Sequence, residues 1–510
     1  MAVRQYIGAR YVIKVYENSL DQSSAEWEAG VTYEPLTLVT YNYSSYLSKK
    51  EVPRSVGDPA SNPAYWVVTG AYNGQILTLQ NEIDEIKDNE VFFNVCFPPV
   101  DSGIAPLDNT GVSDCTAQLQ AIVDYVGNKN GGVIYFPTGR YSIEGTVDCD
   151  YAHITFMGEN RASTWLIHSS NEIMFHVHDV NYCYFKHLIF RTYNADPSTT
   201  SQYILFEDTN YCVCEDLSFM DGCRFIKFKH APGSKVYDVL FNAPNITPTN
   251  KIIAIELENS CVSSRFLRVT CNFLGIGTTP GATGIYTNTH AQDIYIERYE
   301  SAGCNPSIYI QNTTAQNPGD IIIKNSIFDG LKGYGIHLKD IKAATYDNTN
   351  IIDGIYANAY NTDSIFLMRI EDSNHVNVAH VGFNNHHNRK DIGGIQLARC
   401  KHSQVNDCDF THCSKGCYII DSEYCTCSNN VLSIGGETEY YDSTTFRFIM
   451  GINFSGASKR CAAIGNVFDG AETAFSLSAT SEKNIVSLNN VGAGSVTDSG
   501  TNNQVADNLT

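Results

Sequence analysis

The stretch Asn130 to Ile143 reads NGGVIYFPTGRYSI and has the pattern of a corner between two strands. Two glycines free the backbone for a tight turn, and the β-branched and aromatic run that follows has strand composition. Pro137 and Gly139 supply turn chemistry before an apolar alternation resumes at Tyr141. The stretch therefore predicts a strand, a turn and a second strand in close succession.

A similar phrase recurs further along the chain, as LSFMDGCRFIKF from 217, SIFDGLKGYGIHL from 326, CDFTHCSKGCYII from 408 and NVFDGAETAFSL from 466. Its phenylalanine gives the markers Phe219, Phe273, Phe328, Phe410 and Phe468, which are 54, 55, 82 and 58 residues apart. Divided by two, two, three and two turns of a solenoid, these gaps give about 27 to 29 residues per coil. Short apolar strands with Asn, Asp and Gly corners at this period predict a right-handed, single-stranded parallel β-helix, with about 13 coils after residue 150.

The net charge of the chain indicates which kinds of partner it is expected to avoid. The chain has 34 basic and 55 acidic residues, a net charge of −21, which repels phosphate backbones and anionic lipid surfaces. The start, MAVRQYIGARYVI, has no signal-peptide core, and no run approaches the ~20 apolar residues of a spanning helix. We therefore expect no nucleic-acid partner and no membrane insertion, and synthesis in a cytoplasm.

The 17 cysteines are an odd number in a chain without an export signal, so free thiols are expected. The densest group, Cys400, His402, Cys408, His412, Cys413, Cys417, Cys425 and Cys427, lacks the paired CxxC spacing of a zinc site. Pairs such as Cys212 with Cys214 fit small buried residues on one strand face. We predict no metal site and no cofactor.

Residues 108–158 resemble the beginning of the β-helix in the pectate-lyase superfamily, in which a helix caps the first coil before a Gly-Gly strand and a Pro-x-Gly turn. Ser113 or Asp114 is expected to cap this helix. Leu119, Ile122, Val123 and Val126 follow helical spacing and give it one apolar face. The stretch NGGVIYFPTGRYSI then forms the first corner of the β-helix.

Residues 76–86, ILTLQNEIDEI, place Ile76, Leu79, Ile83 and Ile86 at spacings of three and four. This is a seam of two heptads, and isoleucine at both core positions favours trimers. The seam predicts a short trimeric neck at 73–92. The alternative is a monomeric amphipathic helix that lies on the body.

The segment before the neck resembles small chitin-binding-type modules, which share a pattern carried here by Trp27, Tyr33, Val39 with Tyr41, Tyr46 and Trp66. Such modules stack exposed aromatic rings on sugar faces. The same residues also suit the core of a small β domain, which we favour over stacking on sugar.

The chain as a whole resembles a bacteriophage tailspike or tail-fibre protein, because its start, YIGARYV followed by GVTYEPLTLVTYNYSSYLSKKEVP, is similar to the N-termini of phage particle proteins. The resemblance implies an attachment domain (1–72), the neck (73–92), the first β-helical segment with its capping helix (93–150) and the body (151–510). It also implies a homotrimer in the virion that is attached to other particle proteins through the N-terminal domain. Its expected partner is a host surface polysaccharide, which it binds and depolymerises.

Catalytic residues are suggested by a resemblance to polygalacturonase-like hydrolases, which carry Asn-Thr-Asp in one coil, carboxylates in the next and a histidine in the one after. Here the triplet is Asn361-Thr362-Asp363, followed by Asp391 and His412. The resemblance implies that Asp363 and Asp391 are general acid and base and that His412 orients one of them. His386 or Arg389 would contact sugar hydroxyls.

Two alternatives stay open for this region. The same aspartates fit solvent-facing turns, as Asp221, Asp329 and Asp469 do in the recurring phrase, and Glu371-Asp372 is a second acidic pair. A lyase, which needs a cationic base and often calcium, ranks below a hydrolase. The rival function is a fibre that adheres to host or mucosal glycans without cleaving them.

Overall fold

The computed structural model divides the chain into two compact units, Met1–Glu90 and Val91–Thr510, which are described separately. The residues that it describes are 4–8, 11–17, 25–42, 44–71, 91–194, 198, 201–243, 249–276, 281–290, 292–313, 320–342, 350–359, 366–385, 392–433 and 450–509. Among them, no helix is both long enough and apolar enough to cross a membrane.

The first unit is a small five-stranded sheet in the order β1-β2-β3-β4-β5. Its strands are β1 (Arg4–Gly8), β2 (Tyr11–Val15), β3 (Thr37–Tyr41), β4 (Ser44–Ser48) and β5 (Trp66–Ala71). All neighbours are antiparallel except β2 and β3, which run parallel. Of the predicted neck, 73–92, residues 73–90 lie outside the described residues. Its last two residues, 91 and 92, instead begin a strand of the second unit.

The aromatic pattern of this unit forms its core. Tyr33, Val39, Tyr46 and Trp66 are buried, together with Tyr16 and Val52. The rings of Tyr33 and Trp66 meet edge to face, with centroids 5.2 Å apart. Trp27 and Tyr41 pack against this core from its partly exposed side. The core interpretation is therefore confirmed, and the four buried residues offer no platform for a sugar.

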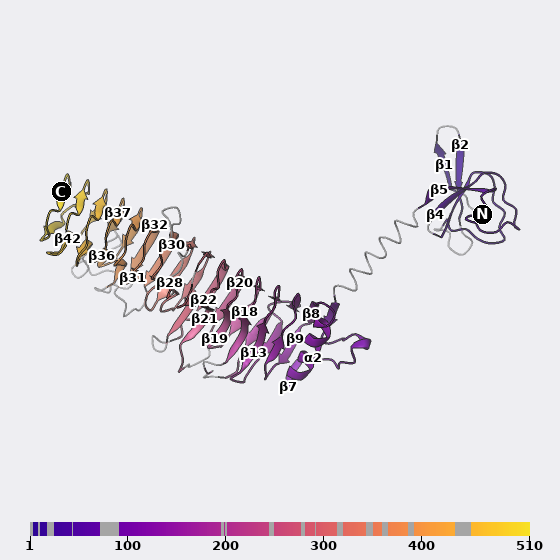
Figure 1. Ribbon diagram of the computed structural model, residues 1–510, viewed down its shortest axis with the longest axis horizontal. Coiled ribbons are helices and arrows are strands. Elements are labelled where there is room, and N and C mark those ends of the chain that lie inside the picture. Colours follow the sequence, from indigo (N-terminus) through magenta and orange to yellow (C-terminus); the bar gives the residue numbers. More distant parts are fainter. Residues whose placement is uncertain are drawn as a thin grey trace, which may run out of the picture. The chain divides into compact units, whose positions relative to one another are not determined.

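The second unit is a right-handed parallel β-helix, in which strands of successive coils lie side by side along the body (Figure 1). One wall is a 14-stranded sheet to which each coil gives one strand. Its strands are β10 (Val147–Cys149), β13 (Ile173–His178), β16 (Gln202–Glu207), β19 (Arg224–Lys229), β21 (Ile252–Glu258), β23 (Ala282–Thr287), β26 (Ile308–Gln311), β29 (Ile336–Lys339), β31 (Phe366–Glu371), β33 (Gly393–Ala398), β36 (Lys415–Ile420), β39 (Met450–Ser455), β42 (Thr473–Leu477) and β44 (Ser495–Asp498).

The other strands form a 26-stranded sheet that wraps the rest of each coil. They are β6 (Val91–Asn94), β7 (Thr110–Asp114), β8 (Gly132–Phe136), β9 (Gly139–Ser142), β11 (Ile154–Gly158), β12 (Thr164–Ile167), β14 (Tyr184–Lys186), β15 (Ile189–Arg191), β17 (Val213–Glu215), β18 (Ser218–Met220), β20 (Lys235–Asn242), β22 (Arg265–Asn272), β24 (Ile294–Glu297), β25 (Glu300–Ala302), β27 (Ile321–Lys324), β28 (Ile327–Leu331), β30 (Asn350–Ala359), β32 (Val376–Asn385), β34 (Gln404–Asn406), β35 (Asp409–Thr411), β37 (Thr426–Ser428), β38 (Val431–Ser433), β40 (Ala462–Ile464), β41 (Val467–Asp469), β43 (Ile485–Ser487) and β45 (Gln504–Ala506).

The coil count agrees with the sequence period. In the described part of the chain, 13 strands of the 14-stranded sheet follow Tyr151, from β13 to β44. One of the five phenylalanine markers, Phe273, was placed wrongly. Strand pairing aligns Cys271 of β22 with the phenylalanines of the preceding coils, whereas Phe273 follows the strand. Phe273 is nevertheless buried, so it fills the core from the adjoining corner.

Inward side chains stack from coil to coil, which is how the solenoid builds its core. Phe190, Phe219 and Phe241 form one such stack, with ring centroids 4.7 Å and 5.1 Å apart. The cysteines belong to the same interior: all 17 are free, and Cys96 alone among them is partly exposed. Their expected role as small buried residues is confirmed.

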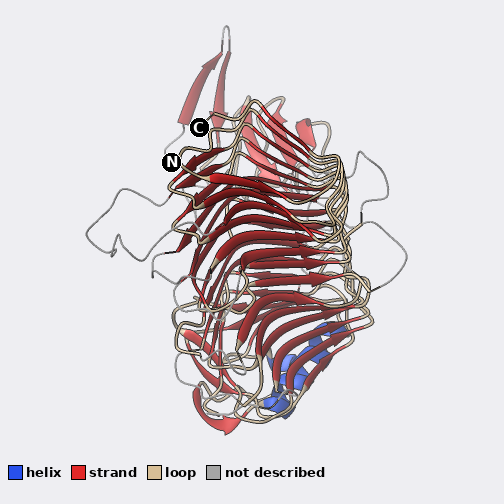
Figure 2. Cartoon of the chain, turned by 90° about the vertical axis from the view of Figure 1, so that its left-hand side faces the viewer, coloured by secondary structure: helices blue, strands red, loops and turns tan. Residues whose placement is uncertain are grey.

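The capping helix is α2 (Thr116–Gly127), which lies at one end of the β-helix (Figure 2). Leu119, Ile122, Val123 and Val126 are its buried residues, as their spacing predicts. The predicted cap is one or two residues early, because the N-cap position belongs to Cys115. Asp114 still serves the helix end, since its Oδ1 accepts the backbone N–H of Thr116 at 2.9 Å.

The stretch NGGVIYFPTGRYSI forms β8 and β9, joined through Pro137 and Thr138. It is not the first corner of the β-helix, because β6 and β7 already lie parallel beside β8 and β9. This neighbour explains the second glycine: a Cβ on Gly132 would lie 2.2 Å from the carbonyl oxygen of Val91. The chain therefore enters the solenoid one coil earlier than the sequence pattern suggests.

Candidate functional site

The outer face of the 14-stranded sheet carries a continuous row of polar and aromatic side chains. Strand pairing places one outward residue of each coil directly beside that of the next. Over the central coils the row reads Tyr286, Tyr309, His337, Arg369, Gln396 and Tyr418. We call these six residues the central row.

Three members of the central row are in ring contact with one another. Tyr286 and Tyr309 are stacked, with centroids 5.4 Å apart and planes 16° apart. His337 meets the ring of Tyr309 edge to face at 5.0 Å, and Tyr334 approaches His337 at 5.1 Å. All four residues are partly exposed. Partly exposed rings with polar ends offer both apolar contact and hydrogen bonds to a ligand on this face.

A buried carboxylate organises the charged end of the row. Glu371, at the end of β31, is 6% exposed. Its Oε1 contacts His337 Nε2 at 3.2 Å and also Arg369 Nε, and its Oε2 contacts Arg399 Nη2 at 3.3 Å. Arg369 Nη1 in turn donates to the hydroxyl of Tyr334 at 2.9 Å. Because both oxygens of Glu371 are engaged, it positions the two arginines and the histidine around it.

The protonation of this cluster follows from its surroundings. Burial lowers the pKa of His337, although the neighbouring Glu371 opposes the shift. The two-pronged contact from Arg399, at 2.6 Å and 2.8 Å, lowers the pKa of Asp372. The outer face of β29 and β31 thus presents a neutral imidazole beside fixed guanidinium groups, an arrangement rich in hydrogen-bond donors.

The comparisons with known proteins concern the β-helix. Residues 101–326 match the family model described as rhamnogalacturonase A/epimerase, pectate lyase-like. This part of the solenoid is similar to the β-helix of pectate-lyase-like proteins. No curated protein matches the sequence.

Solved structures of similar fold include the tailspike protein of Escherichia coli bacteriophage HK620. Its complex with a pentasaccharide is 12% identical, has a TM-score of 0.55, and the match covers 83% of this chain and 81% of that one. A single-residue mutant of the same tailspike in complex with pentasaccharide is 13% identical, with a TM-score of 0.59 and the same coverage. At this identity the likeness shows the β-helix fold alone.

Four of the predicted site residues lie outside the described residues, namely Asp363, Asp391, His386 and Arg389. The strands that follow them are described. Asp363 comes before β31, and the other three come before β33. Since β31 and β33 pair in parallel, the two aspartates predicted to be catalytic precede, in the sequence, neighbouring strands of the sheet that carries the central row.

His412 is described and lies at a corner before β36, the next strand of this sheet. Its φ is 56°, a left-handed conformation that Asp221 also adopts, with φ 58°. The residue is 7% exposed, and its backbone N–H donates to the carbonyl of Ser433 at 3.1 Å. These observations make His412 a corner residue of the solenoid, and its catalytic role stays a prediction.

The sequence interpretation missed the central row, and it named Glu371 only as part of a second acidic pair. A signal was available in the strands GIYT, SIYIQ and GIHLK, where an aromatic residue or histidine stands between two buried aliphatic or small residues. The signal can be recognised only when it is known which residues of successive coils pair with each other.

Proposed function

We propose that this chain is the subunit of a phage tailspike that binds a polysaccharide on the surface of the host cell and cleaves it by hydrolysis. The observation that carries the proposal is the central row, an outward face with contacting aromatic rings and fixed charges on a pectate-lyase-like β-helix. A long polymer suits this geometry, because equivalent positions repeat along the body from coil to coil.

The similar fold of the HK620 tailspike supports this proposal, since that protein was solved in complex with a pentasaccharide. In our proposal the first unit attaches the protein to other components of the virion, and the segment 73–92 assembles three chains. Partly exposed tyrosines of the central row contact sugar rings, and Arg369 and Gln396 bond to hydroxyl or acidic groups.

Binding is tested with polysaccharide extracted from candidate host strains. The double variant Tyr286→Ala/Tyr309→Ala is expected to weaken retention of the polysaccharide at least 10-fold, since stacked aromatic contacts are lost. Tyr211→Ala is the matched control, because Tyr211 is 52% exposed but stands at a corner away from the central row. Equal losses in both variants, or none in the double variant, would contradict a ligand on this face.

Cleavage is tested by following product size by chromatography. In our proposal Asp363 and Asp391 act as general acid and base, as two carboxylates about 5 to 10 Å apart do in glycosidases. Asp363→Asn/Asp391→Asn should therefore abolish shortening of the polymer. Asp409→Asn, an exposed aspartate on β35, should cleave like the parent. Cleavage by the double variant would move the site elsewhere.

A second candidate function is adhesion without cleavage. It is favoured by Glu371, which is the buried carboxylate beside the central row and has its oxygens occupied by ion pairs. A parent protein that retains the polysaccharide without shortening it would establish this function and return Asp363 and Asp391 to the role of turn residues.

A further inference from the structure

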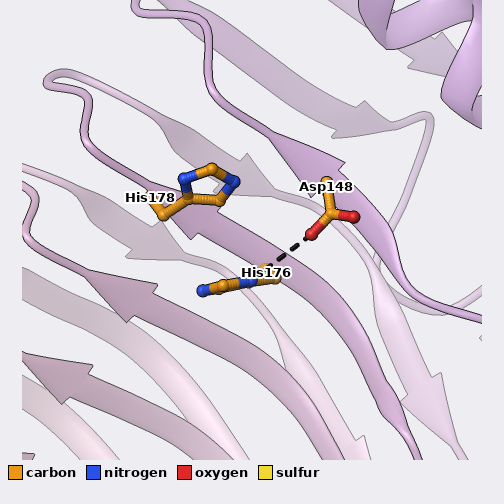
Figure 3. Close-up of side chains that lie close together, drawn as sticks. All are labelled: Asp148, His176 and His178. Atoms are coloured by element: carbon orange, nitrogen blue, oxygen red, sulfur yellow. Dashed lines mark ion pairs between the residues drawn. The ribbon is translucent and has the colours of Figure 1, made fainter.

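A second cluster of chemically active side chains lies near the capping helix, and the strand that carries its histidines is four coils from the first strand of the central row. It consists of Asp148 on β10 and of His176 and His178 on β13. One ligand atom from each of the three lies within 4.8 Å of the others. Figure 3 shows the three side chains turned toward one another on the outer face of the sheet. Among the described residues, this is the one group of three or more such side chains close enough to share a metal ion.

The pairing of β10 with β13 brings these three side chains together. His176 and His178 are two residues apart on one strand, so both point outward, and their ring centroids are 4.6 Å apart. Strand pairing sets Asp148 directly beside His176, and Asp148 Oδ1 lies 3.3 Å from His176 Nδ1. The side chains are 58%, 26% and 28% exposed for Asp148, His176 and His178, which leaves room for an ion and its water.

Each histidine also contacts a second carboxylate through a ring nitrogen. His178 Nδ1 lies 3.1 Å from Asp179 Oδ2, and His176 Nε2 lies 3.1 Å from Glu207 Oε2. When one ring nitrogen donates its proton to a carboxylate, the other nitrogen is left unprotonated and can bind a metal. The contact thereby fixes the tautomer and increases the basicity of the histidine. The nitrogens left for an ion are then His178 Nε2 and His176 Nδ1, the latter being the one beside Asp148.

Glu207 itself serves as a hydrogen-bond acceptor. Its Oε1 accepts from Lys229 Nζ at 2.5 Å, and this contact lowers the pKa of Glu207. With one oxygen held by a lysine and the other by His176, Glu207 is engaged on both sides. Glu207 is therefore not counted as a metal ligand. The three candidate ligand atoms are two imidazole nitrogens and the carboxylate oxygen of Asp148.

The cluster opens into a hollow of about 900 Å³ between α2 and the first strands of the sheet. Four aspartates line this hollow: Asp114, Asp124, Asp148 and Asp150. None of the described residues that line it is a lysine or an arginine. This charge distribution raises the local concentration of cations.

Helix α2 holds the aspartate in place. Gln120 Nε2 donates to the carbonyl oxygen of Asp148 at 2.9 Å, and the backbone N–H of Asp148 donates to Gln120 Oε1 at 2.8 Å. Because β10 is the end strand of the 14-stranded sheet, Asp148 stands where this sheet begins. An ion held between β10 and β13 would tie the end strand to its neighbour.

We propose that Asp148, His176 Nδ1 and His178 Nε2 bind a Zn²⁺-class transition-metal ion that fastens the first coil of the 14-stranded sheet beneath the capping helix. Two imidazole nitrogens with one carboxylate suit zinc and its first-row neighbours, whereas Ca²⁺ and Mg²⁺ take oxygen ligands. Three protein ligands leave the fourth position to water in the hollow.

The test uses the full chain without a histidine tag, stripped of metal with a chelator and titrated with ZnCl₂ in a calorimeter. One Zn²⁺ per chain is expected, together with a rise in the thermal midpoint. Asp148→Asn and His178→Gln should each weaken binding more than 10-fold, and Asp179→Asn should weaken it about 10- to 100-fold. Substitution of Zn²⁺ by Co²⁺ should give visible absorption bands in the parent that are lost in His178→Gln.

The matched control is His230→Gln, because His230 also contacts an aspartate, Asp208, at 3.1 Å but belongs to no such group of three. This variant should bind Zn²⁺ like the parent. Asp148 is more than half exposed, so Asp148→Asn is expected to fold, which circular dichroism checks. No binding, equal binding by Asp148→Asn and the parent, or tighter binding of Ca²⁺ than of Zn²⁺ would overturn the proposal.

Discussion

A ladder of asparagines joins neighbouring coils at the C-terminal end of the solenoid, and its first three members are buried. Asn430, Asn466, Asn489 and Asn508 follow one another, and each side-chain amide donates to the Oδ1 of the next at 2.9 Å. The same oxygens also accept backbone N–H groups of the preceding coil. Such groups are costly when their partner is removed, because they have no access to water.

Asn466→Ala should therefore lower the free energy of unfolding by about 2 to 4 kcal/mol. It removes the acceptor for Asn430 and the donor to the carbonyl of Cys427, both buried. Urea unfolding of parent and variant measures the loss. Asn453→Ala, on the partly exposed outer face of β39, should change stability by less than about 0.5 kcal/mol. An equal effect at both positions would contradict the ladder's role.

The lowered pKa of His337 predicts that the free energy of unfolding depends on pH. The folded-state pKa lies below the unfolded value, so the unfolded chain binds the proton more readily at this residue. The contribution of His337 to stability is therefore full above the unfolded pKa, about 6.5. It is lost progressively as the pH falls below that value toward the folded pKa.

His337→Gln removes this titration. Between pH 7 and pH 5 the variant should lose less of its unfolding free energy than the parent does, measured by urea unfolding at both values. His230→Gln, at a surface histidine paired with Asp208, controls for the loss of a histidine. Identical pH dependence in the parent and His337→Gln would show that burial does not lower this pKa.

At the scale of elements, the corners explain the shape of the coils. Many corners turn on one residue in the left-handed region, with φ near +50° to +60°, and Asn, Asp and His occupy several of them. These residues tolerate that conformation better than branched ones do, because their short polar groups bond locally. The corner expected at Asp221 is thus confirmed, although this side chain is buried and does not face solvent, and His412 belongs with it. The turns expected at Asp329 and Asp469 are wrong, because these residues lie in β28 and β41. There the left-handed conformation falls on the glycine that follows, Gly330 or Gly470.

The capping helix α2 is the element on which the first coils depend, since its apolar face closes their interior. Ile122→Asp should destabilise the protein by about 4 kcal/mol or more, because it buries an unpaired charge. Ala117→Asp changes an exposed residue of the first helical turn and should be neutral within about 0.5 kcal/mol. Thermal unfolding of the two variants measures the difference. If Ile122→Asp and Ala117→Asp unfolded alike, the helix would be dispensable for stability.

At the scale of the whole molecule, we propose that the segment 73–92 assembles three chains. If its heptad seam forms the proposed neck, light scattering should give a mass of three 56.4-kDa chains. Leu79→Asp/Ile83→Asp places charges in the seam and should yield monomers, whereas Thr78→Asp, outside the seam, should leave the trimer intact. A monomeric parent, or a trimeric double variant, would exclude a neck that assembles the protein.

The sequence was sufficient to predict the parallel β-helix, the number of its coils, the buried face of α2 and the aromatic core of the first unit. These features depend on local periodicity, which repeats within single strands and a single helix. Residues such as Leu119, Ile122, Val123 and Val126 reveal their common face by spacing alone.

The central row, the asparagine ladder and the group of Asp148, His176 and His178 emerged only from the folded chain. Each joins residues of different coils, and the coils differ in length: paired positions are 21 residues apart from Phe475 to Val496 but 35 apart from Cys417 to Ile452. An average period cannot supply that register, and an error of one residue exchanges the inward and outward faces of a strand. Side chains that meet across coils are set by backbone pairing between strands, which tertiary packing establishes.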